Sequence, residues 1–362
     1  MKIGNYQRLG NYIEQVNVRN RYLSVTNLMG VSIEKKFIKS IANTIGTDLS
    51  PYKIVKPRQF AYGPVTSRNG DKITIALYNG KEECIISQAY EAFKIKDENE
   101  LLPEYLIMWA KRPEFDRYAR YMSHGSVREL FSWEDMCNVM LPVPPIAEQR
   151  RIVNEYQTVE HRIANNETLI QKLEETAQAI YHHTFVEGID EENLPEGWQK
   201  MTMEDICDFE YGKMPKKDLL VDNGIPVYCG YAVTKYHKEA SHTEKTIVVI
   251  ARGDAGSGEV KMSPKYFFLS NLGIAVLPKD KELKWYLYYH LKSLDTYSLR
   301  TGSAQAQVTI NSLKPFEIVT PPKPLYTLFS NKVEKLANYI DVLLEENNYL
   351  HDLLVLLTSK LS

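Results

Sequence analysis

Two Pro-Pro pairs, 177 residues apart, each precede a long segment of the 362-residue chain that lacks helix-breaking residues. Pro144-Pro145 precedes about 40 residues without glycine or proline, and Pro321-Pro322 precedes a second such segment. The one exception, Pro324, falls in the first helical turn, where proline is tolerated. The same shift superposes Gly125-Ser126 on Gly302-Ser303. The sequence therefore predicts an internal duplication in which each copy ends in a long helix.

Apolar residues recur along both predicted helices at alternating steps of four and three, which is typical of a coiled coil. The first series is Ile152, Tyr156, Val159, Ile163, Asn166, Ile170, Leu173, Ala177 and Ile180. The second is Phe329, Val333, Leu336, Ile340, Leu343, Asn347, Leu350, Leu354, Leu357 and Leu361. We predict an antiparallel coiled coil whose register is fixed by Asn166 opposite Asn347. The alternative is two ordinary amphipathic helices packed on unrelated domains.

The two remaining blocks mix strand-like runs with helical stretches, which predicts an α+β fold for each. In the first block, residues 72–78 and 84–95 are predicted strands, and Asn79-Gly80 between them is predicted as a hairpin turn. In the second block, 245–251 and 265–278 are predicted strands, followed by a helix over 281–294. The predicted target-reading domains are the two mixed blocks, 1–143 and 198–320. Each block is followed by a spacer helix, over 144–186 and over 321–362. An acidic linker at 187–197 joins the first helix to the second block.

Composition is ordinary for a globular protein, with 44% hydrophobic and 25% charged residues. The net charge of −2 is unusual for a nucleic-acid binder, but residues 1–145 carry 20 basic against 16 acidic residues, and 198–322 carry 16 against 14. This mild basicity permits DNA binding. No signal peptide or membrane span is predicted, so we expect a cytoplasmic protein.

No motif for catalysis or for a cofactor is visible in the sequence. The segment RGDAGSG (252–258) lacks the Lys-Ser/Thr ending of a Walker A loop and joins a strand to a strand. The four cysteines form no C-x-x-C pair and are expected to be buried thiols. We therefore expect no enzymatic activity, no metal and no bound cofactor in this chain.

Four segments of the duplicated arrangement are similar to those of a known family: LPVPPIAEQRRIV (141–153), the Gly-Ser loop at 125, LPEGWQKMTMEDI (194–206) and the second copy TGSAQAQVTINSLKPFEIVTPP. Through these segments the chain resembles, over essentially its whole length, the specificity subunits of type I restriction-modification systems. The second copy departs from the pattern, with Lys-Pro-Leu-Tyr-Thr in place of Ile-Ala-Glu-Gln-Arg, which leaves the role of Glu148 and Gln149 without a counterpart there.

The resemblance implies that each block reads half of a bipartite, asymmetric double-stranded DNA site, while the helices set the gap. It also implies methyltransferase (modification) subunits and restriction endonuclease/translocase subunits as partners, which would use S-adenosylmethionine, ATP and magnesium. The alternatives are the DNA-recognition subunit of a related type II system and a coiled-coil scaffold that does not bind DNA.

Base reading requires polar side chains on loops, backed by phosphate contacts. The candidates in the first block are Tyr62, Ser67, Arg68, Asn69, His124, Ser126 and Arg128. The candidates in the second block are Lys213, Lys216, Lys217, Arg252, Asp254, Ser257, Ser303, Gln305 and Gln307. For partner subunits we expect contacts from the outward faces of the helices, including Glu148, Gln149 and Arg151.

Overall fold

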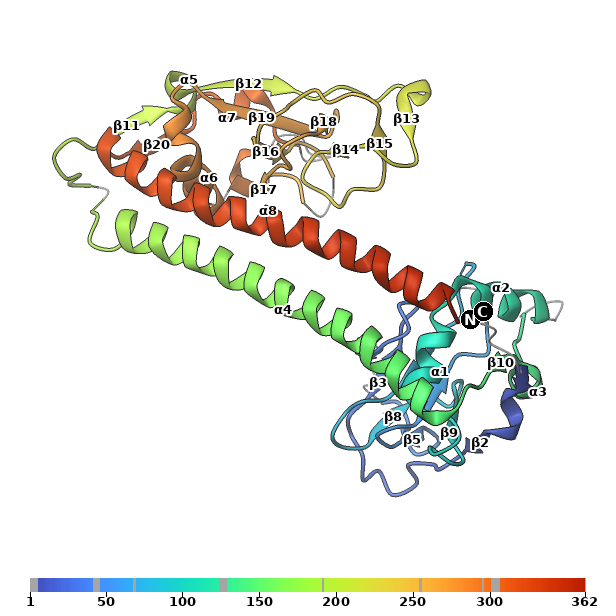
Figure 1. The fold of residues 1–362 in the computed structure, drawn as a ribbon. Helices are drawn as coiled ribbons and strands as arrows, with labels where there is room; N and C mark the ends of the chain where they lie inside the picture. Colours follow the sequence, from blue (N-terminus) through green and yellow to red (C-terminus); the bar gives the residue numbers. More distant parts are fainter. Residues whose placement is uncertain are drawn as a thin grey trace. The chain divides into compact units, whose positions relative to one another are not determined.

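The structure of the chain is a computed structural model (Figure 1), which describes residues 6–41, 46–67, 70–123, 129–190, 192–253, 256–294, 296–300 and 307–361. The chain divides into two compact units. Unit 1 comprises Met1–Asn166 and Glu345–Ser362, and unit 2 comprises Glu167–Leu344. Each unit contains one globular block and a part of each long helix, so unit 1 is assembled from two separate stretches of the chain.

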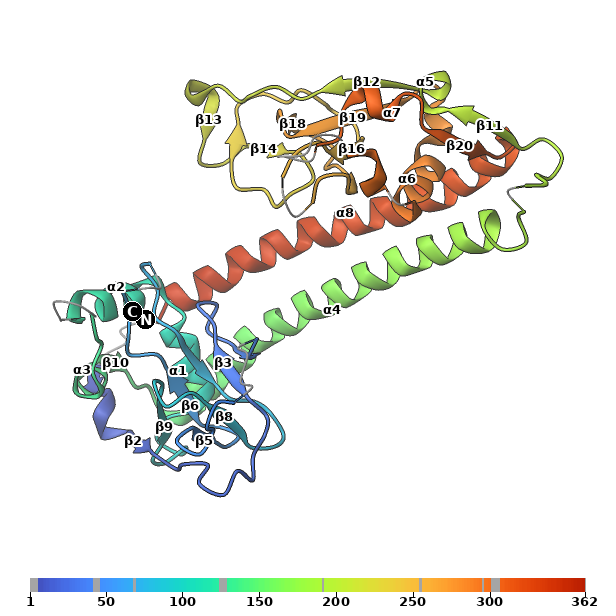
Figure 2. The same ribbon diagram turned by 180° about the vertical axis from the view of Figure 1, so that it is seen from behind.

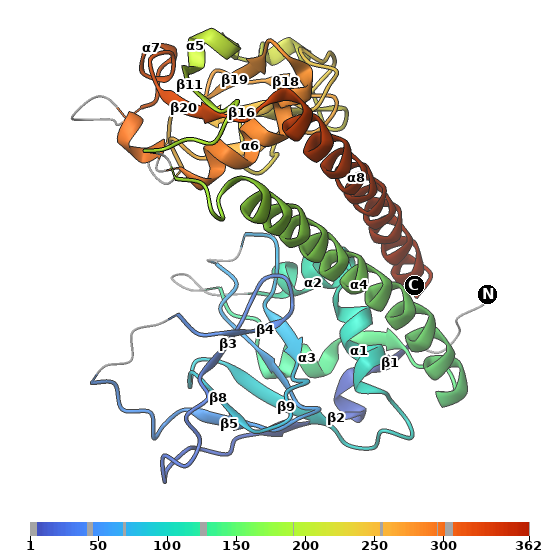
Figure 3. The same cartoon turned by 90° about the vertical axis from the view of Figure 1, so that its left-hand side faces the viewer.

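Unit 1 is centred on a four-stranded antiparallel sheet of order β2-β9-β6-β7, of which β2 and β9 are labelled in Figure 3. These strands are β2 (Ile13–Val16), β9 (Glu91–Ile95), β6 (Phe60–Tyr62) and β7 (Ile75–Leu77). Because side chains alternate along a strand, Phe60 and Phe93 face one side of the sheet and Ala61 and Ala92 face the other. The sheet is therefore the middle layer of three.

Helices cover the large-residue face of this sheet. They are α1 (Pro103–Ala110), α2 (Pro113–Met122) and α3 (Trp133–Asn138), and Tyr105, Leu106 and Phe115 join Phe60 and Phe93 in one core. Short strands lie over the alanine face: β3 (Met29–Val31) pairs with β4 (Phe37–Lys39), and β5 (Lys53–Val55) pairs with β8 (Cys84–Ile86). A further pair joins β1 (Tyr6–Arg8) to β10 (Met140–Pro142).

The hairpin predicted at Asn79-Gly80 is wrong. The strand before this turn, β7, pairs with β6, whereas the strand after it, β8, pairs with β5. The two strands belong to different sheets in different layers, because long-range pairing with β6 and β5 prevails over the local turn signal. The predicted strand over 84–95 is likewise divided into β8 and β9.

Unit 2 repeats the central sheet in the order β12-β19-β16-β17, of which β12, β19 and β16 are labelled in Figure 2. These strands are β12 (Cys207–Tyr211), β19 (Gly273–Pro278), β16 (Ile247–Ile250) and β17 (Val260–Met262). The helices are α5 (Met203–Ile206), α6 (Lys284–Ser293) and α7 (Ile310–Leu313). The second layer is β13 (Leu220–Val221), β15 (Tyr236–His237), β14 (Ile225–Tyr228) and β18 (Phe268–Leu269), while β11 (Gln199–Thr202) pairs with β20 (Glu317–Thr320).

Four 3-10 turns complete the described elements: η1 (Leu9–Asn11), η2 (Lys217–Leu219), η3 (Lys281–Leu283) and η4 (Thr296–Leu299).

The same side-chain hydrogen bonds recur in both units. Lys96 Nζ donates to Gly10 O at 2.8 Å, and Lys279 Nζ donates to Glu204 O at 2.8 Å. The hydroxyl of Tyr105 on α1 donates to Pro142 O, and that of Tyr286 on α6 donates to Val319 O. Capping boxes begin α3 at Ser132 and α7 at Thr309. The sequence duplication is therefore also a duplication of the fold.

The two long helices are α4 (Ile146–Phe185) and α8 (Lys323–Ser359). Within unit 1, Val153 and Tyr156 of α4 share a core with Leu361, and Asn166 Nδ2 donates to Asn347 Oδ1 at 2.8 Å. The helices thus run antiparallel in unit 1. The amide pair is almost fully buried, at 2% and 7% exposure.

In unit 2 the same helices meet through aromatic side chains. The rings of Phe185 and Phe329 lie 5.1 Å apart between centroids, and those of Tyr181 and Phe329 lie 6.2 Å apart. Ala177 and Val333 belong to the same core. The direction is again antiparallel, because the end of α4 meets the start of α8.

Candidate nucleic-acid interface

In each unit, several loops leave the four-stranded sheet at one end, which we call the loop end. It is the end at which β2 and β6 finish in unit 1, and β12 and β16 finish in unit 2. In unit 2 the register pairs Tyr211 with Ile274 and Ile250 with Gly273, so the last residues of β12 and β16 lie beside the first residues of β19. Loops that are far apart in sequence are therefore neighbours.

Three of the predicted DNA-binding residues of unit 2, Lys213, Arg252 and Gln307, lie at this loop end. Lys213 follows β12, and its backbone forms a bridge with Ser270. Arg252 follows β16, and its Nε donates to Gln307 Oε1 at 3.0 Å. The exposed Lys216 and Lys217 continue the loop after Lys213, and Asp254, Ser303 and Gln305 lie outside the described residues.

The loop end of unit 1 is built in the same way. Val16 is paired with Ala92, and Tyr62 with Glu91. The loop after β6 is joined to the segment before α3 by the Thr66 N–H, which donates to the carbonyl oxygen of residue 129 at 3.0 Å. The exposed Ser67 follows directly, whereas Arg68, Asn69, His124, Ser126 and Arg128 lie outside the described residues.

Two of the predicted DNA-binding side chains are buried, so these predictions are wrong. Tyr62 has 0% exposure, its ring packs against Phe93 and Phe131, and burial strongly raises the pKa of its hydroxyl. Ser257 also has 0% exposure, and its hydroxyl donates to Ala251 O at 3.3 Å. Both side chains lie in the interior of their unit and are therefore not accessible to a DNA duplex.

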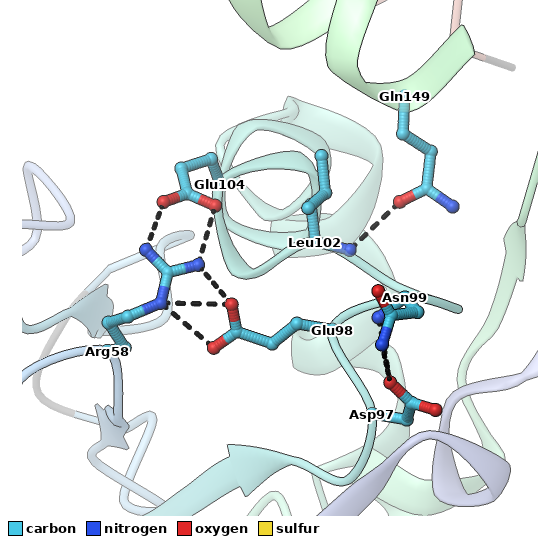
Figure 4. Close-up of polar contacts among 7 residues, drawn as sticks. All are labelled: Arg58, Asp97, Glu98, Asn99, Leu102, Glu104 and Gln149. Atoms are coloured by element: carbon cyan, nitrogen blue, oxygen red, sulfur yellow. Dashed lines mark hydrogen bonds and ion pairs between the residues drawn. The ribbon is translucent and has the colours of Figure 1, made fainter. Parts of the chain in front are cut away.

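The prediction that Gln149 contacts a partner subunit is also wrong, because this side chain is buried. Its side chain has 0% exposure and makes three hydrogen bonds to backbone groups, of which Figure 4 draws the one with Leu102. Its Oε1 accepts from Leu102 N, the residue before α1, at 2.9 Å, and its Nε2 donates to Glu100 O and Pro144 O, each at 2.8 Å. Gln149 therefore joins the start of α4 to the start of α1.

A tyrosine takes over this task in unit 2. The 177-residue shift superposes Gln149 on Tyr326, and the Tyr326 hydroxyl donates to Asp280 Oδ2 at 2.8 Å. Asp280 in turn accepts from Glu282 N at the turn that leads into α6. In the second copy, the hydrogen bond between Tyr326 and Asp280 thus replaces the hydrogen bonds of Gln149 as the connection between the starts of two helices.

Of the two other predicted partner-binding residues on α4, Arg151 is exposed and Glu148 is half-buried. Arg151 forms an ion pair with Glu148, with Nη2 and Oε1 2.6 Å apart, and a second one with Glu155. The hydrogen bond from Arg151 lowers the pKa of Glu148. Both side chains remain accessible to another protein.

The loop end of unit 1 also holds residues that the sequence reasoning missed. Arg19 follows β2 as Lys213 follows β12, and its backbone forms a bridge with Lys53. Lys53 Nζ contacts Glu91 Oε2 at 2.8 Å, and Tyr22 farther along the loop is 94% exposed. A basic residue two or three positions after a short strand in each copy is the signal that could have found Arg19.

The described residues contain no group of three or more His, Cys, Asp or Glu side chains placed to hold a metal ion. Within the same residues, no helix is both long enough and apolar enough to span a bilayer.

Comparison with known proteins finds a family match in both copies of the repeat. The profile of the type I restriction modification DNA specificity domain matches residues 34–175 and 195–343. The specificity subunit of the type I restriction enzyme MjaIX from Methanocaldococcus jannaschii is 21% identical over 276 residues, which are 66% of this chain and 63% of that protein. The putative type I restriction enzyme MjaX specificity subunit of the same organism is 19% identical over 294 residues, 74% of this chain and 69% of that protein.

The chain thus spans slightly less than two thirds of the first of these relatives. Among solved structures, the S subunit of a type I restriction-modification system from M. genitalium matches with a TM-score of 0.64 and 17% identity, over 99% of this chain and 95% of that one. This likeness concerns the fold, and these matches do not favour the scaffold or the type II alternatives. Since the family profile covers most of both copies of the repeat, the chain belongs to the family of type I restriction-modification DNA specificity domains.

Proposed function

We propose that the chain is the DNA-specificity subunit of a type I restriction-modification enzyme and that each unit reads one half of a bipartite, asymmetric site. The observation that carries this proposal is the duplicated sheet, whose loop ends present different side chains on the same frame. A duplicated frame with different loops suits two readers of different sequences. Exposed basic residues such as Lys213, Lys216 and Lys217 supply the contacts to phosphate that such a reader needs.

In this proposal α4 and α8 form an antiparallel coiled coil that keeps the two reading blocks, 1–143 and 198–320, at a fixed spacing. The buried hydrogen bond between Asn166 and Asn347 supports this role, because a polar pair in an apolar seam penalises any shifted register. The acidic segment 187–197 links the first helix to the second block.

The chemistry is assigned to partners. Methyltransferase subunits and endonuclease/translocase subunits would carry out modification and cleavage in the cytoplasm, and the chain itself would have no catalytic role. The exposed Arg151 and the half-buried Glu148, both on α4, are proposed partner contacts. Gln149 is not among them, because it is buried.

The test is to express the chain with the type I methyltransferase subunit of its own organism and to map methylated bases across the genome of the expressing cell. The expected result is one bipartite motif with a constant gap, which disappears when the chain is omitted. A continuous motif, a variable gap or methylation that does not depend on the chain would contradict the proposal.

A further inference from the structure

One pair of residues bridges two loops at the loop end of unit 1. The backbones of Val65 and Leu130 form an isolated antiparallel bridge. Beside it, Phe131 N donates to Pro64 O at 2.8 Å. The pair is apolar and partly open to solvent, with Leu130 44% exposed.

Unit 2 has the same frame with a polar pair on it. Val308 N donates to Ala251 O at 2.9 Å, which repeats the backbone hydrogen bond of unit 1. Arg252 directly follows Ala251, and Gln307 directly precedes Val308. Arg252 and Gln307 therefore occupy the positions held by the apolar pair in unit 1.

Gln307 orients the guanidinium of Arg252. Its Oε1 accepts from Arg252 Nε at 3.0 Å, which fixes the inner nitrogen of the planar group. The two terminal nitrogens of Arg252 make no hydrogen bond or ion pair with the residues that the structure describes, and the side chain is exposed. The outer edge of the guanidinium thus presents two parallel N–H donors outward.

The loop that carries Arg252 is braced. Gly253 has φ +127°, and a Cβ there would lie 2.2 Å from the hydroxyl of Tyr231, which itself donates to Arg252 O at 3.4 Å. Ser257 N donates to Gly253 O at 3.1 Å, and Arg300 Nε donates to Ser257 O at 2.7 Å. Backbone that is held by such hydrogen bonds loses little conformational freedom on binding, and the bonds at Arg252 and Gly253 therefore favour a backbone position for Arg252 that is set before DNA binds.

We propose that Arg252, oriented by Gln307, reads a guanine in the half-site recognised by unit 2. The inference rests on the proposed function. Guanine presents two acceptors, O6 and N7, at the edge of the major groove, and two parallel N–H donors match them. Adenine presents a donor in place of O6 and is rejected. Gln307 acts as a positioning residue, because it orients Arg252 and need not touch the base.

The competing assignment for Arg252 is a phosphate contact, which is independent of sequence. Substitution by lysine separates the two, since lysine keeps the charge but loses the planar fork. The comparison with unit 1 adds a second criterion. Val65 and Leu130 offer no side-chain donor, so guanine dependence through this position is expected in one half-site only.

The experiment uses the full chain in complex with its methyltransferase partner and a DNA library in which every position of the mapped motif is varied. For Arg252→Lys we expect the preference for guanine at one position to fall by about 5- to 150-fold, with the other half-site unchanged. For Gln307→Leu, which installs the unit 1 residue, we expect a smaller loss of the same preference and an unchanged salt dependence.

Lys213→Ala is the matched control, for which we expect weaker binding to all sequences and a lower salt dependence. The inference is overturned if Arg252→Lys keeps the preference, or if Arg252→Ala weakens all sequences equally. It is also overturned if the half-site read by unit 2 contains no guanine. Failure of the proposed function is distinguishable, because the wild-type complex would then direct no bipartite methylation.

Discussion

The two units retain the same hydrogen bonds in their frames but differ in the layer that covers the second face of the sheet. In unit 1 this layer consists of two antiparallel pairs, β3 with β4 and β5 with β8. In unit 2, β14 instead pairs parallel with β18 and antiparallel with β15. The frame bonds of Lys96 and Lys279 end on backbone carbonyls, which any sequence provides. A fold held in this way tolerates extensive change in its loops and outer layer.

The largest effect is expected where unit 1 has a buried ion pair. Lys35 on the β3–β4 turn is 6% exposed, and its Nζ contacts Asp116 Oδ1 at 2.7 Å and also donates to Ala110 O. Lys35→Met would leave Asp116 buried without its countercharge. We expect unit 1 to lose about 3–5 kcal/mol of unfolding free energy. Hydrogen exchange during urea unfolding, followed separately in peptides of each unit, measures this loss.

Lys72→Met is the matched control for Lys35→Met. Lys72 Nζ lies 3.1 Å from Glu34 Oε1 in the same region, but both side chains are exposed, so little change in stability is expected. If the two variants lose the same stability, or if unit 2 is destabilised as much as unit 1, the buried pair has no special role.

A smaller, pH-dependent effect is expected in unit 2. His290 on α6 is the counterpart of Trp109 on α1, and its Nδ1 lies 2.9 Å from the hydroxyl of Tyr181. Burial lowers the pKa of His290 from 6.5 to about 4. Because the folded state resists protonation, stability is fully present above pH 6.5 and falls as the pH drops toward 4. The expected loss is about 3 kcal/mol, at 1.36 kcal/mol per pKa unit.

The variant His290→Trp installs the residue found in unit 1. We expect its unit 2 to lose less stability than wild type between pH 6.5 and 4, as measured by denaturant unfolding at a series of pH values. His242, whose pKa is also lowered by burial, is present in both proteins, so its effect cancels. Equal acid sensitivity of the two proteins would rule out His290 as the cause.

The smallest effect on stability is expected where Gln149 in unit 1 and Tyr326 in unit 2 connect the starts of two helices. Gln149→Leu would leave three backbone groups without their partner, and we expect a loss of about 2 kcal/mol in unit 1. Tyr326→Phe removes one hydrogen bond to Asp280, which keeps its ion pair with Lys323, and about 1 kcal/mol is expected in unit 2. Hydrogen exchange at the start of α1 and of α6 compares them. A larger loss from Tyr326→Phe would reverse the interpretation.

The long helices were predictable from the sequence, whereas the burial of individual side chains was not. The Pro-Pro pairs and the absence of breakers identify α4 and α8, since helix signals are local. Tyr62 is the last residue of a three-residue strand, too short for its alternation to tell which side chain faces the core. Gln149 reads as a surface residue until the neighbouring backbone groups of Glu100 and Leu102 are known.

Asp254 and the other candidates outside the described residues remain predictions. The pairing of β7 with β6 rather than with β8 was equally hidden, because strand partners distant in sequence leave no local pattern.

Unit 1 is built from the first and the last stretch of the chain, which affects the order in which the protein folds during synthesis. Leu361, 2% exposed, belongs to the same core as Val153 and Tyr156, and Arg112 donates to its carbonyl. The ribosome makes Leu361 only after the whole of unit 2, so the first block to be translated is the last to complete its core. A nascent chain interrupted before Glu345 would carry a first block that lacks Leu361 in its core, and it would expose this unfinished domain to quality-control proteases.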